Sequence, residues 1–221
     1  MNLDAVIFDL DGTLIDSMGV WADVDVEFLS KRNIKPPKDI FSNIDSGNSF
    51  AEVAQYFKKK FKLNDTIEDI MNEWTDMVST HYEKRIKLKN GVRDLLNYLV
   101  SKNIKLGVGT SNNKVLTRKV LVSNHIYDLF DVIITGCQAE RGKPHPEIFL
   151  KVAESLKVSP DKCLVIEDVL VGVKAAKAAG MKVCAIEDIH SLNDKEEIKK
   201  IADFFADDFN LILEIVKKIS E

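Results

Sequence analysis

Short apolar runs recur along the chain and alternate with segments whose apolar residues follow helical spacing. Each run is rich in Val and Ile and is followed by a polar or glycine-bearing turn, a pattern typical of buried parallel strands. Six runs predict strands, at Ala5–Phe8, Lys105–Gly109, Val132–Thr135, Cys163–Ile166, Lys182–Ile186 and Phe204–Ala206. The alternation of strands and helices predicts an α/β fold built on a doubly wound, Rossmann-like parallel sheet.

One long stretch interrupts this alternation. From about Ser17 to about Arg85 no strand-like run occurs, and the apolar residues recur only at helical spacing. About 70 helical residues are too many for a crossover within a compact sheet. We therefore expect an all-helical cap domain, residues 17–85, inserted into an α/β core domain formed by residues 1–16 and 86–221. The loop at 43–49, rich in Asn, Ser and Gly, connects two of its helices and is the expected specificity loop.

Composition and charge narrow the class of protein. Of the 221 residues 45% are apolar and 30% charged, which is ordinary for a globular protein and excludes a disordered chain. A net charge of −4 offers no basic field for a nucleic-acid backbone. The apolar runs are too short to span a bilayer, the N-terminus lacks the basic region of a signal peptide, and the three cysteines are dispersed. We therefore predict a cytoplasmic protein that binds neither nucleic acid nor membrane.

Acidic residues follow two of the predicted strands. Asp9 and Asp11 come directly after the first strand, and Glu167 and Asp168 directly after the fourth. Ligands of open α/β sheets lie beyond the carboxyl ends of the strands. Carboxylates that two parallel strands deliver to one edge form a hard-oxygen site suited to Mg²⁺. The alternative for the first pair is an Asx turn with a helix cap.

Two further segments offer groups that bind phosphate. The second strand is followed by Thr110, Ser111 and Asn112, turn residues before a helix whose side-chain and backbone donors suit a phosphoryl group. Lys143 lies between Gly142 and a Pro-x-Pro segment, and so belongs to a stiff loop. A lone lysine is ordinarily a solvated charge, but beside the acids and hydroxyls it predicts a cation that clamps phosphate.

These four motifs, in this order, resemble those of the haloacid dehalogenase superfamily, and the resemblance covers the whole chain. The helical insert after the first motif resembles the cap of the branch that includes phosphoglycolate phosphatase and β-phosphoglucomutase. The resemblance implies a Mg²⁺-dependent phosphatase that acts on a small phosphorylated metabolite such as a sugar phosphate. Asp9 would be the nucleophile that becomes an aspartyl phosphate, and Asp11 the general acid and then the general base.

The resemblance also implies the binding residues. The groups that would hold Mg²⁺ are the Asp9 carboxylate, the Asp11 backbone carbonyl, Asp168, and Glu167 directly or through water. The groups that would bind the phosphoryl oxygens are Thr110 and Lys143, with Ser111 and Asn112 contributing from the turn.

The cap positions bear on the type of reaction. β-Phosphoglucomutases, which this chain resembles in the core, carry a His on the first cap helix and an Arg in the cap loop. In this chain the position of the His falls at Trp21, and that of the Arg falls at Phe50, three residues after Gly47. Phe50 cannot clamp the second phosphate of a bisphosphate, so a hydrolase is favoured over the alternative, a mutase. Trp21, Gly47 and Phe50 are the candidate specificity residues, although Trp21 and Phe50 fit the cap core equally well.

One alternative is not an enzyme. The phosphate-accepting receiver domain also combines acids, a hydroxyl and a lysine on an α/β sheet. Receiver domains are shorter, and their phosphorylated aspartate lies on a middle strand.

The acid at Asp11 separates phosphoryl transfer from dehalogenation, because the dehalogenases lack it. We expect a small-molecule substrate and a monomer or weak dimer.

Overall fold

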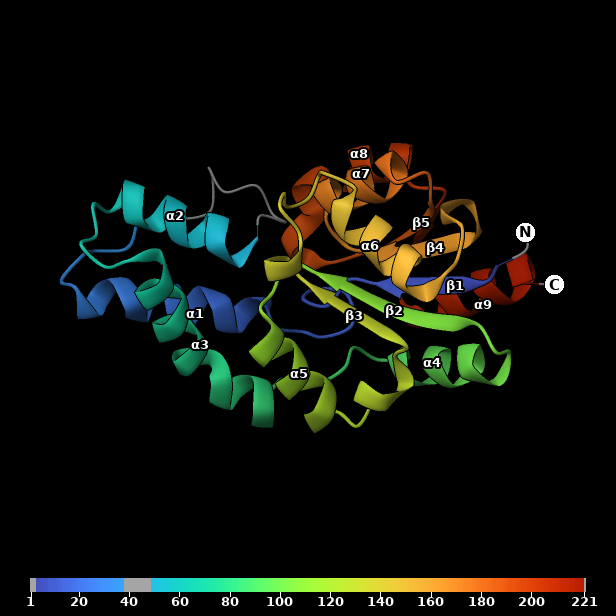
Figure 1. Cartoon of the computed structure of the whole chain (residues 1–221), viewed down its shortest axis with the longest axis horizontal. Helices are drawn as coiled ribbons and strands as arrows, with labels where there is room; N and C mark the ends of the chain where they lie inside the picture. The colour runs from blue at the N-terminus through green and yellow to red at the C-terminus, as the bar shows by residue number, and fades with distance from the viewer. Residues whose placement is uncertain (1–2, 38–48, 221) are drawn as a thin grey trace.

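The computed structural model describes residues 3–37 and 49–220. At its centre lies a six-stranded sheet with the order β3-β2-β1-β4-β5-β6, in which every neighbouring pair is parallel (Figure 1). The strands are β1 (Ala5–Phe8), β2 (Lys105–Thr110), β3 (Val132–Thr135), β4 (Cys163–Glu167), β5 (Lys182–Ile186) and β6 (Phe204–Ala206). All six predicted strands are confirmed, with β2 and β4 each one residue longer than predicted.

The strand order determines where a ligand site is expected. β1 lies between β2 and β4, with Ala5 paired to Lys105 on one side and to Cys163 on the other. The chain leaves β1 toward β3 at one edge and later continues from β4 toward β6 at the opposite edge. Such a reversal opens a crevice outside the carboxyl ends of the central strands. The order also differs from the 2-1-3-4-5 order of receiver-type sheets.

Helices cover both faces of the sheet (Figure 1). One face carries α4 (Val92–Ser101), α5 (Lys114–Ser123) and α9 (Phe209–Ser220), and the other α6 (Glu147–Leu156), α7 (Leu170–Ala178) and α8 (Lys195–Ile201). Short 3₁₀ helices link these elements, at η1 (Tyr127–Leu129), η2 (Gly136–Gln138), η3 (Pro160–Lys162) and η4 (Ile189–Asp194). Successive side chains of β1 alternate between the two cores, Val6 and Phe8 on one side and Ala5 and Ile7 on the other. The doubly wound α/β fold is therefore confirmed.

Three helices lie beyond the carboxyl ends of the strands (Figure 1). These cap helices are α1 (Met18–Lys31), α2 (Phe50–Lys60) and α3 (Ile67–Lys84). The described part of residues 17–85 contains no strand, as predicted, while its division from the core as a separate domain stays a prediction. Gly47 and nearly all of the predicted specificity loop lie outside the described residues. No helix in the described ranges is both long and apolar enough to cross a membrane.

Local sequence signals explain where two cap helices begin. Ser49 accepts a hydrogen bond from the Glu52 backbone N–H (3.3 Å), and the Glu52 carboxylate accepts one from the Ser49 backbone N–H (2.6 Å). Thr66 and Asp69 form the same reciprocal pair at the start of α3. This capping box satisfies backbone donors that have no partner within the helix. The two boxes therefore fix the first turns of α2 and α3.

Aromatic rings fill the interior between the cap helices. The Trp74 ring lies 4.9 Å from that of Phe57 and 5.4 Å from that of Phe28, between centroids, in edge-on and tilted arrangements. Asp25 of α1 is only 4% exposed on the same buried face as Phe28, and it has no hydrogen-bond or ion-pair partner among the described residues. Burial raises the pKa of Asp25 to about 7. Ionisation of Asp25 in the cap interior therefore lowers the stability of the fold.

Candidate active site

Asp9 lies at the centre of the crevice predicted by the strand order. It follows β1 directly, and its backbone N–H donates to the Ile166 carbonyl of β4 (3.0 Å). Its side chain is nearly buried, and Lys143 Nζ lies 2.6 Å from Asp9 Oδ1. Burial raises the pKa of Asp9 to about 7; Lys143 opposes this rise and the Glu167 carboxylate adds to it. A carboxylate in this place is poorly hydrated and depends on neighbouring cations.

Lys143 is the cation that the structure brings to Asp9. Its ammonium group is buried, with a second contact of 2.5 Å to Glu167 Oε1, and it lies 5.0 Å from the centre of the Phe149 ring. Burial lowers the pKa of Lys143, but the two carboxylates outweigh this effect and raise it above its ordinary value. Lys143 is therefore a fixed positive charge rather than a solvated one, in line with the prediction from its stiff loop.

Glu167 forms the second ion pair of Lys143. It is fully buried, and while Oε1 contacts Lys143, Oε2 accepts hydrogen bonds from the backbone N–H groups of Asp168 (2.8 Å) and Val169 (2.9 Å). A Cβ atom on Gly172 of α7 would lie 1.8 Å from Glu167 Oε1, so the carboxylate needs a glycine there. Both oxygens of Glu167 are thus engaged by protein groups. Its predicted contact with a metal stays a prediction, and its observed contacts make it the anchor of Lys143.

Asp168 extends toward the loop that carries Asp11. Its Oδ1 atom accepts a hydrogen bond from the Thr13 hydroxyl (2.6 Å). Gly12 has a φ of +86°, and a Cβ atom there would come within 2.3 Å of Asp168 Oδ2, so glycine permits both the turn and the close approach. Burial, together with the charges of Glu167 and Asp9, raises the pKa of Asp168. Asp168 therefore lies within electrostatic reach of Asp9, as the sequence predicts.

The charges of this group fit a divalent cation. Of the three buried carboxylates, those of Asp9 and Glu167 contact a single ammonium group, that of Lys143, while Asp168 has no ion pair among the described residues, which leaves excess negative charge. Within the described ranges no group of three or more acidic, histidine or cysteine side chains is arranged to hold a metal. Mg²⁺ usually keeps several waters and takes only one or two carboxylates. Asp9 and Asp168, with the Asp11 backbone carbonyl and water, fit that donor set.

Asp11 is held by three side chains rather than by a cation. Its Oδ1 atom accepts hydrogen bonds from the hydroxyls of Ser17 (2.6 Å) and Tyr82, and its Oδ2 atom accepts one from Asn112 Nδ2 (2.8 Å). The side chain is half-buried, at the point where the core meets the cap helices. A carboxylate oriented in this way is suited to proton transfer, provided that a substrate group can reach it.

The segment after β2 contributes to both sides of the site. Thr110, the last residue of β2, is buried, and its hydroxyl oxygen accepts a hydrogen bond from the Asn112 backbone N–H (3.1 Å). The Ser111 carbonyl accepts one from the Phe50 backbone N–H at the start of α2 (3.2 Å). Asn112, predicted to bind phosphate, directs its amide to Asp11 and Tyr82 instead. The phosphate-binding roles of these residues stay predictions.

The described cap residues among the specificity candidates have different surroundings. The Phe50 side chain is 8% exposed, and its ring lies 5.6 Å from that of Trp21 and 5.7 Å from that of Trp74. Trp21 is half-buried, and its Nε1 donates to the Tyr82 hydroxyl (2.8 Å). Phe50 thus packs as cap core, whereas Trp21 is linked through one side chain to Asp11.

Sequence reasoning missed three residues that hold the acids. Thr13 lies two residues after Asp11 and Ser17 six residues after it, at positions where a hydroxyl is typical of an ordinary turn or helix cap. Tyr82 follows Trp74 and Val78 at intervals of four, so it continues the buried stripe of α3. A buried tyrosine hydroxyl usually has a hydrogen-bond partner, which is the signal that could have found it.

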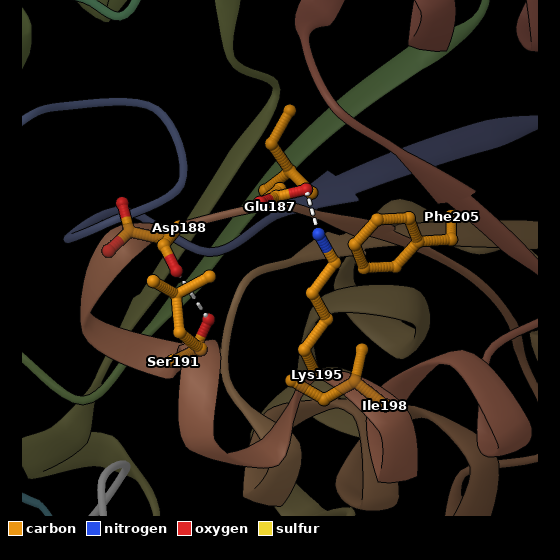
Figure 2. A pocket seen from close by; sticks show the side chains of 8 residues that line it. Glu187, Asp188, Ser191, Lys195, Ile198 and Phe205 are labelled. Atoms are coloured by element: carbon orange, nitrogen blue, oxygen red, sulfur yellow. Dashed lines mark hydrogen bonds and ion pairs between the residues drawn. The ribbon is translucent and has the colours of Figure 1, made fainter.

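Two hollows lie at the carboxyl ends of β5 and β6. In the smaller one Lys195 Nζ reaches Glu187 (2.6 Å), and the Ser191 hydroxyl donates to the Asp188 carbonyl (3.1 Å), as Figure 2 shows. The larger, of about 570 Å³, is lined by both connections between core and cap and by the ends of these strands. Within it Lys89 pairs with Asp188 (2.5 Å). In both hollows a lysine is paired with an acid.

Comparison with known proteins agrees with this geometry. Residues 6–186 match the haloacid dehalogenase-like hydrolase family. The chain is 30% identical to a phosphorylated carbohydrates phosphatase of Thermotoga maritima over 193 residues, 87% of this chain and 88% of that protein. The crystal structure of CbbY from Rhodobacter sphaeroides in complex with phosphate has the same fold, with a TM-score of 0.85, 24% identity and coverage of 94% and 95%. That of β-phosphoglucomutase from Clostridium difficile has a TM-score of 0.80, 25% identity and coverage of 98% and 96%.

The family match covers most of the chain and includes all four motifs. It makes the chain an enzyme of the hydrolase class, so the receiver-like alternative is not supported. The acids after β1 and β4, the lysine loop and the cap helices are the features on which the resemblance was based, and the family match spans them all. The chain belongs to the haloacid dehalogenase-like hydrolases, in the branch of phosphoglycolate phosphatase and β-phosphoglucomutase.

Proposed function

We propose that this enzyme is a Mg²⁺-dependent phosphatase that hydrolyses a small phosphorylated metabolite of the sugar-phosphate type. The observation that carries the proposal is the buried group in which one lysine faces Asp9 while a second acid, Asp11, stands two residues further along the same loop. Such a pair supplies a nucleophile and a proton carrier within one loop. The phosphorylated carbohydrates phosphatase of Thermotoga maritima supports the substrate class.

Asp9 is the nucleophile in this proposal. Lys143 contacts only its Oδ1 atom among the described residues, which leaves Oδ2 for attack on phosphorus. The attack forms an aspartyl phosphate and breaks the bond between phosphorus and the leaving oxygen. Lys143 is close enough to Asp9 to bind a phosphoryl oxygen as charge develops on it, and Thr110 at the end of the neighbouring strand β2 has a hydroxyl for another.

Asp11 carries the proton in both halves of the reaction. It gives a proton to the leaving alcohol oxygen in the first half, and takes one from the water that attacks the aspartyl phosphate in the second. The second half releases inorganic phosphate and regenerates Asp9. This order of events needs a second acid that is not itself phosphorylated, and Asp11 is that acid in this proposal. Its carboxylate is oriented by hydrogen bonds from Ser17, Tyr82 and Asn112.

Asp9, Asp168 and the Asp11 backbone carbonyl would hold Mg²⁺. When bound, the ion reduces the repulsion between the anionic nucleophile and the anionic phosphate. The excess of buried carboxylates over cations supports this assignment, since without a cation these acids have raised pKa values. Glu167 contributes through Lys143, with any contact to the ion made through water.

The similarity to β-phosphoglucomutase of Clostridium difficile makes a phosphosugar mutase the second candidate. A mutase must retain its bisphosphate intermediate while that intermediate reorients, and this requires a cation on the cap side that binds the second phosphate. Phe50 stands where the mutases carry that cation, an Arg, and Trp21 stands where they carry a His; the two rings pack against each other, 5.6 Å between centroids. This packing favours the phosphatase. A cytoplasmic location and a monomer or weak dimer accompany the proposal as predictions.

A panel of phosphate esters, with pyrophosphate added, tests the proposal. The purified protein is incubated with hexose phosphates, glycerol 3-phosphate, phosphoglycolate, pyrophosphate and p-nitrophenyl phosphate, with Mg²⁺ or with excess chelator, and released phosphate is measured. We expect turnover of at least one sugar or polyol phosphate with Mg²⁺ and little with chelator. Asp4→Asn is the matched control for Asp9→Asn, because Asp4 precedes β1 and its side chain forms a surface ion pair with Lys162. Full activity in chelator, or no hydrolysis of any ester, would refute it.

A further inference from the structure

Three side chains hold Asp11, and they come from α3, from the residue before α1 and from the segment after β2. Tyr82 is fully buried on α3, and its hydroxyl lies against Asp11 Oδ1 although the two residues are 71 positions apart. Ser17 directly precedes α1 and Asn112 follows β2. The carboxylate of Asp11 is thus fixed where cap and core meet, and Tyr82 is the contribution of helix α3.

The surroundings of the Tyr82 hydroxyl determine where its proton points. The Tyr82 oxygen accepts hydrogen bonds from Trp21 Nε1 (2.8 Å) and from Asn112 Nδ2 (3.0 Å). The indole N–H can only donate. The amide of Asn112 is oriented independently, because its Oδ1 accepts from the Asn113 backbone N–H (2.7 Å). With two donors on its oxygen, Tyr82 directs its own proton to Asp11 Oδ1.

The two carboxylate oxygens of Asp11 differ in the number of hydrogen bonds they accept. Each carboxylate oxygen has two acceptor positions. Oδ1 receives both hydroxyls, from Ser17 and Tyr82, and is fully used. Oδ2 receives only the Asn112 amide among the described residues, so one acceptor position remains. A proton on Asp11 therefore belongs on Oδ2.

We propose that Tyr82 is a positioning residue, which holds Asp11 so that Oδ2 is the oxygen that exchanges the proton. The inference rests on the proposed phosphatase function. In the first half-reaction the Oδ2–H bond breaks, and the proton goes to the leaving oxygen as its bond to phosphorus breaks. In the second, Oδ2 takes a proton from the attacking water. Trp21 acts one step further away, by fixing the Tyr82 hydroxyl.

The test compares leaving groups that differ in their need for a proton. Tyr82→Phe removes one hydroxyl and keeps the ring that packs on Trp21, 6.0 Å between centroids. The two probes are p-nitrophenyl phosphate, whose leaving group departs as an anion, and glycerol 3-phosphate or glucose 6-phosphate, whichever the wild type hydrolyses faster. The measured quantity is kcat/KM, which covers only the steps up to formation of the aspartyl phosphate. We expect a loss of about 10-fold or more on the alkyl phosphate and under about 3-fold on the aryl phosphate, since proton transfer contributes about 100- to 10,000-fold in total.

Two further variants separate positioning from a general structural effect. In an Asp11→Asn background the Tyr82→Phe change should cause no further loss on the alkyl phosphate, because Tyr82 acts through Asp11. Tyr98→Phe is the matched control: its hydroxyl contacts Ser220 Oγ (3.3 Å), far along the chain from the site, and it should leave kcat/KM unchanged. Trp21→Phe should show a smaller loss with the same leaving-group preference, and replaces Tyr82→Phe in the comparison if that variant does not fold.

The outcomes are distinct. Equal losses on both esters, no loss, or an additive loss in the Asp11→Asn background would overturn the role of Tyr82. A wild-type protein that hydrolyses no compound of the panel described above would instead overturn the proposed function, and the positioning role with it. A larger loss on the alkyl phosphate that disappears in the Asp11→Asn background is the result that supports the inference.

Discussion

Gly172→Ala tests whether the missing side chain at Gly172 of α7 leaves the space in which Glu167 holds Lys143. A Cβ atom at this position would lie 1.8 Å from Glu167 Oε1 and 2.0 Å from its carboxyl carbon. Ordinary contacts begin at 3.4 Å, so the Glu167 carboxylate must move by about 1.5 Å or more. That movement breaks the 2.5 Å contact with Lys143 or the two backbone hydrogen bonds to Oε2.

The size of the effect follows from burial. Both partners are almost completely inaccessible, and breaking a buried ion pair costs about 3 to 5 kcal/mol. Alanine recovers about 1 kcal/mol because it favours helix over glycine. The free energy of unfolding should therefore fall by about 2 to 4 kcal/mol, and Tm by about 5 to 15 °C for a chain of this length. Phosphatase activity should fall with it, since Lys143 loses its anchor.

Urea denaturation and calorimetry measure the change. Gly19→Ala is the matched control, because Gly19 is also helical but nothing lies within 4 Å of its added Cβ atom; its stability should stay the same or rise slightly. In a Glu167→Ala background the Gly172→Ala change should become neutral or stabilising. A Gly172→Ala protein as stable and as active as the wild type would refute the packing argument.

Three further results are expected. The folded pKa of Asp25 lies near 7, above the value of 3.8 for an ordinary aspartate, so the free energy of unfolding should decrease by up to about 4 kcal/mol between pH 4 and pH 7. Asp25→Asn should remove this decrease in urea titrations at several pH values, whereas Asp23→Asn, exposed on the same helix, should not. Asp9→Asn should lower turnover at least about 100-fold in a folded protein, because an amide is not a competent nucleophile; higher residual activity would exclude Asp9 from that role. With β-glucose 1-phosphate, a trace of glucose 1,6-bisphosphate and Mg²⁺, free phosphate should form faster than glucose 6-phosphate, and the reverse order would favour the mutase.

The sequence alone determined the sheet and the position of the motifs along it. Buried strands such as Cys163–Glu167 are short apolar runs bounded by polar turns, and this pattern is local, so their bounds could be predicted to within one residue. Because the carboxyl ends of parallel strands share one edge, Asp9, Thr110 and Asp168 could also be assigned to one site. The capping signals of α2 and α3 are local in the same way.

Only the tertiary structure decided which of these groups meet. Lys143 and Asp9 are 134 positions apart, and nothing in the local pattern says that Glu167 faces the lysine while Asp168 faces Thr13. Helical spacing predicts that the Tyr82 position is buried, but the partner of its hydroxyl depends on how α3 packs against the core. Periodicity determines the face on which a side chain lies; the hydrogen bond it makes there is determined by the packing of elements distant in sequence.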